Sequence, residues 1–527
     1  MLFDRVKPLD AILATAEKKS LHRSLGAFQL TMLGIGAIIG TGIFVLTAAA
    51  AQKAGPGMMI SFMVAGFVCA VAALCYSELA SMVPVSGSAY TYTYAVMGEL
   101  LAWMVGWALV LEYAVAASAV CVGWSGYVMG LIHSTTGFSL PVFLSSGPAW
   151  GLDGFVPTVD FSHGVINLPA IIVAAAVTWL LVIGTSESAT VNAVLVAVKV
   201  VALTAFIVIS LPIIKGENFT PFMPTGLMGH NGLGVIGAAA SIFFAYVGFD
   251  AVSTAAEETK NPQRNVPIGL IGSLAICTVF YLLVAAGVIG TVGAQPVRDL
   301  AGNVLPPDGV DFANRCAELA ASAAGAPIAC SKEALAETLR RMDFGLVGDL
   351  VGLAASIALP SVILMMIYGQ TRIFFVMARD GLLPESLADV HPKFRTPWKM
   401  TIFTGICVAV AGAFFPVGQL ADISNSGTLF AFFMVAIAVM ILRHKDPTRF
   451  RPFRTPLVWI IAPIAAVGCL GLYLNLPFIA KMVLPVWGAI GLLIYFLYSR
   501  NSSHVGRGLV EVHEEDKDVP PTALPPI

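Results

Sequence analysis

Two apolar stretches of this sequence are interrupted by glycine, Leu33–Phe44 and Phe243–Asp250. The first holds four glycines within nine positions, at residues 34, 36, 40 and 42. Each glycine costs about 1 kcal/mol of helix stability relative to alanine. Lipid cannot hydrogen-bond the backbone that a helix break exposes, so a broken membrane helix must line a cavity inside the protein. The two stretches therefore predict a binding site built from two interrupted helices, as in a carrier.

The exposed backbone of such breaks offers partners for both signs of charge. Amides at the start of a half-helix attract an anion, and here they belong to Gly40, Thr41 and Gly42. Carbonyls at the ends of the other half-helices attract a cation, and they lie near Ile38, Phe244 and Val247. The combination suits a zwitterion that carries one carboxylate and one ammonium. The alternative is close helix packing through small residues four positions apart.

Three ionisable side chains lie deep in apolar segments: Glu112, Lys199 and Asp250. Each costs about 3 kcal/mol at the centre of a membrane helix, so each is expected to have a partner or a function. Lys199 is about 16 Å from the inner end of its segment at 1.5 Å per residue, too deep to reach the interface easily. Asp250 could instead cap the helix that follows it, and Glu112 could form a hydrogen bond between helices.

The composition places the chain in a membrane. Of its 527 residues, 57% are hydrophobic and 11% are charged, whereas soluble domains carry about 25% charged residues. A net charge of −2 argues against a nucleic-acid partner. Apolar runs of about 20 residues predict twelve membrane spans. Their approximate bounds are 28–52, 58–82, 95–130, 165–184, 188–213, 233–255, 267–291, 347–377, 399–415, 419–442, 456–475 and 478–498.

The distribution of lysine and arginine predicts the orientation of these spans. With a cytoplasmic N-terminus, the inner segments hold 20 Lys and Arg residues and the outer segments hold eight. The remaining cation, Lys199, lies within a span, and Lys53 counts as one of the outer charges. This asymmetry follows the positive-inside rule and predicts that both termini are cytoplasmic.

The chain is expected to divide into three parts: a cytoplasmic segment (1–27), a transmembrane region (28–498) and a disordered cytoplasmic tail (499–527). Two outer excursions interrupt the membrane region. Residues 131–164 are rich in Gly, Pro and Ser and predict a loop, whereas residues 292–346 predict a small cap with two short helices. The breaks lie in spans 1 and 6, so the second copy enters from the opposite side. This spacing predicts an all-α protein with a five-plus-five inverted repeat and two additional C-terminal helices.

Two of the eight cysteines, Cys316 and Cys330, lie in the hydrophilic outer cap. They could form a disulfide in an oxidising compartment or remain two free thiols. The other six lie in apolar spans, where cysteine is a small apolar residue. No histidine falls in a predicted membrane core, so we expect neither a histidine proton relay nor an intramembrane metal site. We also expect no cofactor.

Several motifs resemble the amino acid–polyamine–organocation permeases. They are the first break, the run Tyr76–Tyr92, and the second break with its continuation to Pro267. The run Ser424–Phe432, closing with Leu442-Arg443, is similar to the cationic amino acid transporter branch in its bacterial, twelve-span form. The resemblance covers residues 20–500. One departure is the alanine run 48–51, where the family often has another glycine.

The resemblance implies a secondary, alternating-access transporter of L-amino acids in the inner or plasma membrane. It places the substrate at the two breaks, with Phe244 as an aromatic lid. Related folds hold sodium between spans 1 and 8, and the family resemblance places a lysine where Lys199 lies, which predicts sodium-independent transport coupled to protons. Asp250 and Glu112 are the candidate proton carriers.

The expected partners are an amino acid, protons and the bilayer, and the expected state is a monomer. An amino acid exchanger of the same fold is the first alternative. A membrane-embedded enzyme of the acyltransferase type is the second, but the sequence lacks the paired nucleophile and base that such chemistry needs. No phosphate-binding Gly-Lys-Ser/Thr loop is present, which argues against ATP drive.

Overall fold

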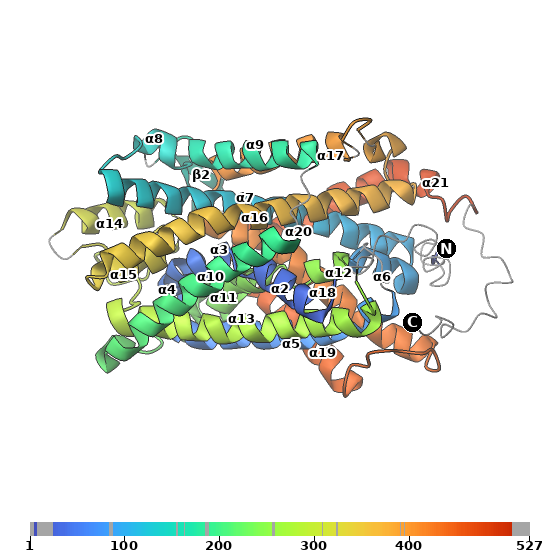
Figure 1. Cartoon of the computed structure of the whole chain (residues 1–527), viewed down its shortest axis with the longest axis horizontal. Coiled ribbons are helices and arrows are strands. Elements are labelled where there is room, and N and C mark those ends of the chain that lie inside the picture. Colours follow the sequence, from blue (N-terminus) through green and yellow to red (C-terminus); the bar gives the residue numbers. More distant parts are fainter. Residues whose placement is uncertain are drawn as a thin grey trace.

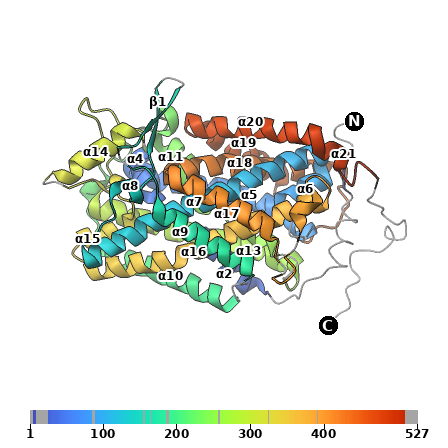
Figure 2. The same cartoon turned by 90° about the horizontal axis from the view of Figure 1, so that it is seen from above.

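The computed structural model describes residues 5–7, 25–83, 88–153, 156–162, 164–184, 189–255, 259–307, 309–322, 325–389, 391–394 and 396–508. These residues form an elongated bundle whose long helices run along its long axis (Figure 1). One end carries α14, α15 and a small hairpin, and we call it the cap end. The opposite end carries α6 and α21, and we call it the α6 end (Figure 2).

The twelve predicted apolar segments all fall on helices. The first span is divided into α2 (Ala27–Ile38), α3 (Thr41–Phe44) and α4 (Leu46–Ala54), and the sixth into α11 (Gly234–Ile242), the 3-10 turn η5 (Phe243–Tyr246) and α12 (Ala251–Thr254). The other ten are α5 (Met58–Met82), α7 (Glu99–Thr136), α9 (Leu168–Ile183), α10 (Ala189–Ser210), α13 (Pro262–Val292), α16 (Gly345–Arg379), α17 (Trp398–Phe414), α18 (Val417–Lys445), α19 (Val458–Leu474) and α20 (Phe478–Ile494). Among the described residues, seven helical stretches are long and apolar enough to cross a membrane, and five shorter apolar helices accompany them.

The long helices pack in two groups around the divided ones. Helix α13 packs along α5 and α2, whereas α16 packs along α7, and α17 along α9. Helix α18 contacts both groups, because it packs against α7 on one side and α5 on the other. The short helix α6 (Ser88–Met97) precedes α7, and Gly98 between them has a φ of 93°, which a residue with a side chain rarely adopts.

The described chain is mostly helical, as the all-α class predicts, but the prediction of a loop at 131–164 was wrong in two places. Helix α7 continues to Thr136, and a hairpin lies at the centre of the segment. Strand β1 (Ala149–Asp153) pairs antiparallel with β2 (Val156–Asp160), with Ala149 opposite Asp160 and Trp150 opposite Val159. The short helix α8 (Val142–Ser145) precedes the hairpin. The Gly and Pro content of the segment predicted a loop. The segment also contains three residues that favour a strand, Val156, Thr158 and Val159, and pairing with a second strand stabilises them in that conformation.

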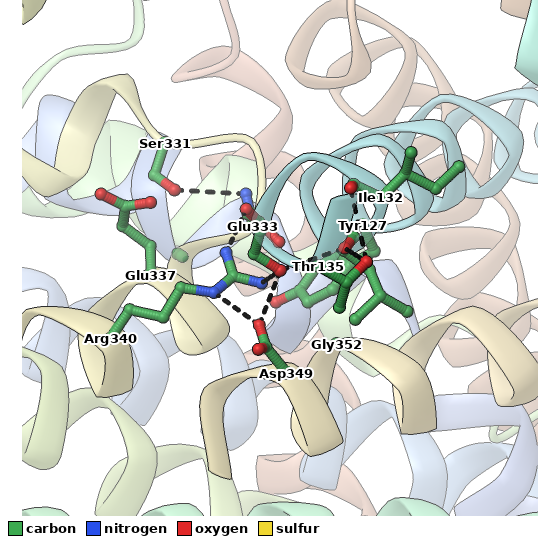
Figure 3. A network of polar contacts seen from close by, with 12 residues as sticks. Tyr127, Ile132, Thr135, Ser331, Glu333, Glu337, Arg340, Asp349 and Gly352 are labelled. Atoms are coloured by element: carbon green, nitrogen blue, oxygen red, sulfur yellow. Dashed lines mark hydrogen bonds and ion pairs between the residues drawn. The ribbon is translucent and has the colours of Figure 1, made fainter. Parts of the chain in front are cut away.

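The cap contains the two predicted helices, α14 (Val310–Ala321) and α15 (Ala334–Arg341), and the turn η7 (Ile328–Cys330). In the structure, a disulfide joins Cys316 to Cys330. The guanidinium of Arg340 on α15 donates hydrogen bonds to the carboxylates of Glu333 and Asp349, and Asp349 lies near the start of α16 (Figure 3). The bond to Asp349 is 3.0 Å long. Burial raises the pKa of Glu333 to about 7, against the opposing effect of the Arg340 charge. A titratable group therefore lies inside the junction between the cap and the bundle.

At the α6 end, the chain termini meet the ends of α7 and α16. Arg5 forms an ion pair with the fully buried Glu99 at 3.2 Å, and Lys7 forms one with Asp380 at 2.7 Å. Helix α21 (Arg500–Ser502) follows α20 through the π-helical turn η9 (Tyr495–Ser499), and the Ser503 hydroxyl donates to Glu99. The start of the predicted disordered tail is therefore ordered. Residues 509–527 of that tail, and residues 1–4 and 8–24, lie outside the described part.

Candidate substrate site

The first break lies between α2 and α3, where the sequence predicts it. Helix α2 ends at Ile38, Ile39 is extended, and α3 begins at Thr41 after Gly40. Among the described residues, the amides of Gly40, Thr41 and Gly42 donate no backbone hydrogen bond, and the buried Thr41 hydroxyl has no partner. A cluster of donors at a helix start is thus available to an anion such as a carboxylate.

The second break lies directly beside the first. Helix α11 ends at Ile242 and continues into η5, which ends at Tyr246. Gly248, with a φ of 111°, then turns the chain toward α12. A Cβ on Gly42 would lie 2.2 Å from the Cα of Ala245, and one on Gly248 would lie 3.0 Å from the carbonyl carbon of Ala37. These glycines allow the backbones of the two divided helices to touch, so both of the predicted readings, helix break and close packing, apply to the same residues.

Tyr281 of α13 connects the two breaks. It was not among the residues predicted for the site. Its hydroxyl lies 2.9 Å from the carbonyl oxygen of Ile38 and 2.8 Å from that of Ala245. Three carbonyls were predicted to attract the ammonium of a substrate. The carbonyl of Ile38 already accepts a hydrogen bond from Tyr281, and the carbonyl of Phe244 accepts one from the amide of Val247 at 3.2 Å. A buried tyrosine hydroxyl in an apolar span usually has a partner, and that expectation could have drawn attention to Tyr281.

Lys199 of α10 reaches the inner half of the first divided helix. Its ammonium donates to the carbonyl oxygen of Gly36 at 2.7 Å and lies 3.4 Å from the hydroxyl of Ser361 on α16. The side chain is 1% exposed. The ammonium of Lys199 therefore lies between the first and eighth spans, against the carbonyl of Gly36.

The two deep carboxyls both lie close to Tyr113. The Tyr113 hydroxyl donates to Asp250 at 2.9 Å, and Glu112 precedes Tyr113 on α7. Asp250 occupies the N-cap position of α12, but its side chain makes no cap hydrogen bond there. Glu112 is 1% exposed, and neither of its carboxyl oxygens has a hydrogen-bond partner within the described part of the chain. The alternative role of Glu112 in a hydrogen bond between helices stays a prediction, and Thr428 of α18 is the side chain that interacts with its carboxyl.

Aromatic rings close the α6 end of this region. Phe244 is 6% exposed at the second break. Beyond it, the ring of Phe432 on α18 lies 5.0 Å from that of Phe249, and both rings lie 6.1 Å from that of Tyr76 on α5. The Tyr76 ring also contacts Tyr92 of α6. A solute at the breaks would have to displace this cluster to leave toward the α6 end.

The described residues contain no group of three or more His, Cys, Asp and Glu side chains that could hold a metal ion. What the region offers is backbone amides, carbonyls, one ammonium and two carboxyls. Such groups are of the kind that can bind a charged solute, and the described ones named here include no activated nucleophile.

Two touching interrupted helices, with ionisable groups at their depth, define a membrane carrier of the broken-helix class. The family model described as amino acid permease matches residues 25–498. The chain therefore belongs to the amino acid permease family, as its motifs suggested.

Individual relatives agree with this class. The chain is 44% identical over 498 residues to a branched-chain amino acid permease of Bacillus subtilis (strain 168), covering 94% of this chain and 97% of that protein. It is 41% identical over 502 residues to a methylthioribose transporter of the same organism, covering 95% and 98%. It is 33% identical over 446 residues to the vacuolar cationic amino acid transporter 2 of Arabidopsis thaliana, covering 84% and 63%. All three are named as transporters or permeases and none as an enzyme.

Proposed function

We propose that the chain is a secondary active transporter of L-amino acids that is driven by protons and independent of sodium. The main support for an amino acid substrate comes from the free amides of Gly40, Thr41 and Gly42. They can bind the carboxylate that all amino acids share. The ammonium would lie at the carbonyl ends of the breaks, near Ile38, Phe244 and Val247, with Phe244 as the lid. The relatives' names make a branched-chain side chain the first to test.

The position of Lys199 supports proton coupling. Its ammonium supplies a permanent charge to the carbonyl of Gly36, so transport needs no sodium ion there. Glu112 and Asp250 are the proton carriers in this proposal. An unpaired buried carboxyl is less costly when neutral, and Glu112 can therefore hold a proton inside the membrane.

The transport cycle alternates access to the breaks. Spans 1, 2, 6 and 7 rock against spans 3, 4, 8 and 9 in a five-plus-five inverted repeat, and the two packing groups of the bundle suit that division. The α6 end faces the cytoplasm, with both termini, and the cap lies outside. The chain acts as a monomer in the plasma membrane.

Uptake into proteoliposomes tests this function. We expect saturable uptake of a branched-chain amino acid that rises with an inward proton gradient and does not change with sodium. One proton moving down 100 mV supplies about 2.3 kcal/mol, enough for roughly 50-fold accumulation of a zwitterion. Strict sodium dependence, or uptake only in exchange for internal amino acid, would contradict proton symport. Uptake of methylthioribose but of no amino acid would contradict the substrate class.

A matched pair of glycine variants tests the site. Gly42→Ala should abolish substrate binding, because its Cβ would meet the Ala245 backbone at 2.2 Å. Gly40→Ala should retain binding, because the nearest atom is a Val362 methyl at 3.4 Å. Equal affinity in the two variants, at equal expression, would refute the assignment of the site.

A further inference from the structure

A cavity of about 510 Å³ lies at the cap end, between α4, α18, the hairpin and the start of α14. Its wall includes Trp150 and Asn231, and its charged groups are Lys53, Asp422 and Asp311. Cavities of roughly 300 to 1,000 Å³ are the usual size for small-molecule sites. Figure 2 shows α4, α11, α14 and β1 gathered at this end. None of the residues assigned to the breaks lines this cavity.

The charged part of the cavity wall is a buried triad from three helices. The Lys53 ammonium of α4 donates to Asp422 of α18 at 2.9 Å, and both groups contact the Ser241 hydroxyl of α11. Lys53 is 2% exposed and Asp422 is 4% exposed. The triad thus connects the cap-end halves of both divided helices to α18. The nearby Asn425 of α18 strengthens that connection by donating to the carbonyls of Ala240 and Ser241 at 2.8 and 2.9 Å.

We propose that this cavity is a second, outer binding site for the zwitterionic amino acid, in which the ligand exchanges partners with the Lys53–Asp422 pair. The ligand carboxylate takes the place of Asp422 at Lys53, and the ligand ammonium takes the place of Lys53 at Asp422. The inference rests on the proposed function for the identity of the ligand. This outer site is separate from the two helix breaks, because none of the residues assigned to the breaks lines the cavity.

The energetics of buried ion pairs favour such an exchange. Removing one member of a buried pair is costly, because it leaves an uncompensated charge. A zwitterion supplies both charges at once, so neither Lys53 nor Asp422 is left without a partner during the exchange. A ligand with only one charge would satisfy one member and leave the other, so the triad selects for molecules that carry both groups.

The rest of the wall suits the remainder of an amino acid. The Trp150 ring is stacked on Phe415 at 4.7 Å and offers a rigid apolar surface for a side chain. The exposed carboxyl of Asp311, in the first turn of α14, attracts the ammonium end of an approaching ligand. Once the ligand separates Lys53 from Asp422, the triad no longer holds α4 against α18, while Asn425 still bonds α11 to α18. Movement of α4 can then open the path to the breaks.

The stoichiometry of binding tests the proposal. Equilibrium dialysis of radiolabelled leucine against the purified full chain in detergent should give two molecules per chain. Lys53→Met combined with Asp422→Asn removes both charges and preserves size, and it should give one. Gly42→Ala, which blocks the deep site, should also give one, with the outer molecule retained.

A control variant and the possible outcomes separate this inference from the proposed function. Arg315→Met with Glu318→Gln removes a partly exposed ion pair on α14 and should retain two molecules. One molecule per chain in the unmodified protein, abolished by Gly42→Ala, would overturn the outer site and leave the deep site in place. No binding of any amino acid would overturn the proposed function itself. Two molecules in the Lys53/Asp422 variant would overturn the triad as the outer site.

Discussion

At the cap end, Lys53, Ser241 and Asp422 hold three helices together by charge, whereas at the α6 end the rings of Tyr76, Phe249 and Phe432 hold theirs by apolar contact. A zwitterionic ligand can compete for charged partners, but it offers nothing that replaces a ring. If the cap-end pair binds substrate as proposed, binding itself can open that end. Opening of the α6 end would instead require movement of the helices.

The α6 end has charges too, but they lie beyond the rings and form a closed network. Glu78 of α5, 1% exposed, accepts from Arg443 at 2.7 and 2.9 Å and from the amide of Thr455 at 2.8 Å. Arg451 adds a fourth contact at 3.1 Å. With four contacts from the protein itself, this carboxylate has no need of a ligand.

The largest effect is expected from breaking that network. Glu78→Gln leaves the buried Arg451 guanidinium without a negative partner, and the loss of a buried partner costs about 3–5 kcal/mol. Unfolding in detergent should show this loss. Glu318→Gln, which removes an exposed member of an ion pair on α14, should change stability by less than about 1 kcal/mol. Equal stability of the two variants would show that the α6 end does not depend on Glu78.

The cap end should respond to pH through Glu333. Its pKa rises from the ordinary value of 4.5 to about 7 on folding, so the folded chain holds a proton that the unfolded chain releases in this window. The contribution of Glu333 to the free energy of unfolding is therefore largest below pH 4.5 and is lost as the pH rises through 7. The pKa shift corresponds to a loss of about 3 kcal/mol, at 1.36 kcal/mol per pKa unit. Glu333→Gln should remove this pH dependence and be the more stable protein at pH 8. Glu318→Gln, at an exposed position on α14, should show the same pH dependence as the unmodified protein. A pH dependence of Glu333→Gln equal to that of the unmodified protein would contradict the prediction.

The disulfide should contribute somewhat less. It closes a loop with a sequence separation of 14, which the loop-entropy model values at up to about 3 kcal/mol. Replacing both Cys316 and Cys330 by Ser should lower stability by about 2–3 kcal/mol, whereas Cys407→Ser, at an exposed free thiol, should not. Mass spectrometry of unreduced peptides gives the decisive readout, because alkylation of both cysteines without reductant would exclude the bridge.

The smallest effect is expected at the aromatic cluster. Phe432→Leu retains apolar volume but removes ring contacts, which contribute about 0.5–1.5 kcal/mol per aromatic pair. Because the rings lie between the breaks and the α6 end, the variant should also increase labelling of a cysteine placed at the breaks by a reagent added from the α6 side, which we propose to be cytoplasmic. Phe430→Leu, two residues away and outside the cluster, is the control. Equal labelling of the two variants would show that the rings do not form the closure.

The features that the sequence could predict are those set by local chemistry. Glycine weakens a helix wherever it lies, so the breaks at Gly40 and near Gly248 were placed correctly. The depth of Lys199 follows from counting residues, and that count indicated a partner inside the bundle. The apolar segments and both cap helices followed from composition and periodicity in the same way.

The features that the sequence could not predict depend on distant partners. Tyr281 lies 243 positions from Ile38, and Lys53 lies 369 positions from Asp422, so no local pattern connects them. Lys53 counted only as an outer charge, although it is buried. The hairpin at Trp150 was missed for the same reason, since a short strand is stabilised by its partner and little by its own sequence.

Gln52 of α4 makes the cap and the first divided helix a single mechanical unit. Its fully buried amide donates to the carbonyls of Val297 and Leu305 at 3.0 and 2.7 Å, and its oxygen accepts from the amide of Val297 at 2.7 Å. When α4 tilts, the segment between those residues must travel with it. Leu300, at the tip of that segment, is 92% exposed. A spectroscopic label at Leu300 should therefore report the tilt of the buried helix from the water outside the membrane.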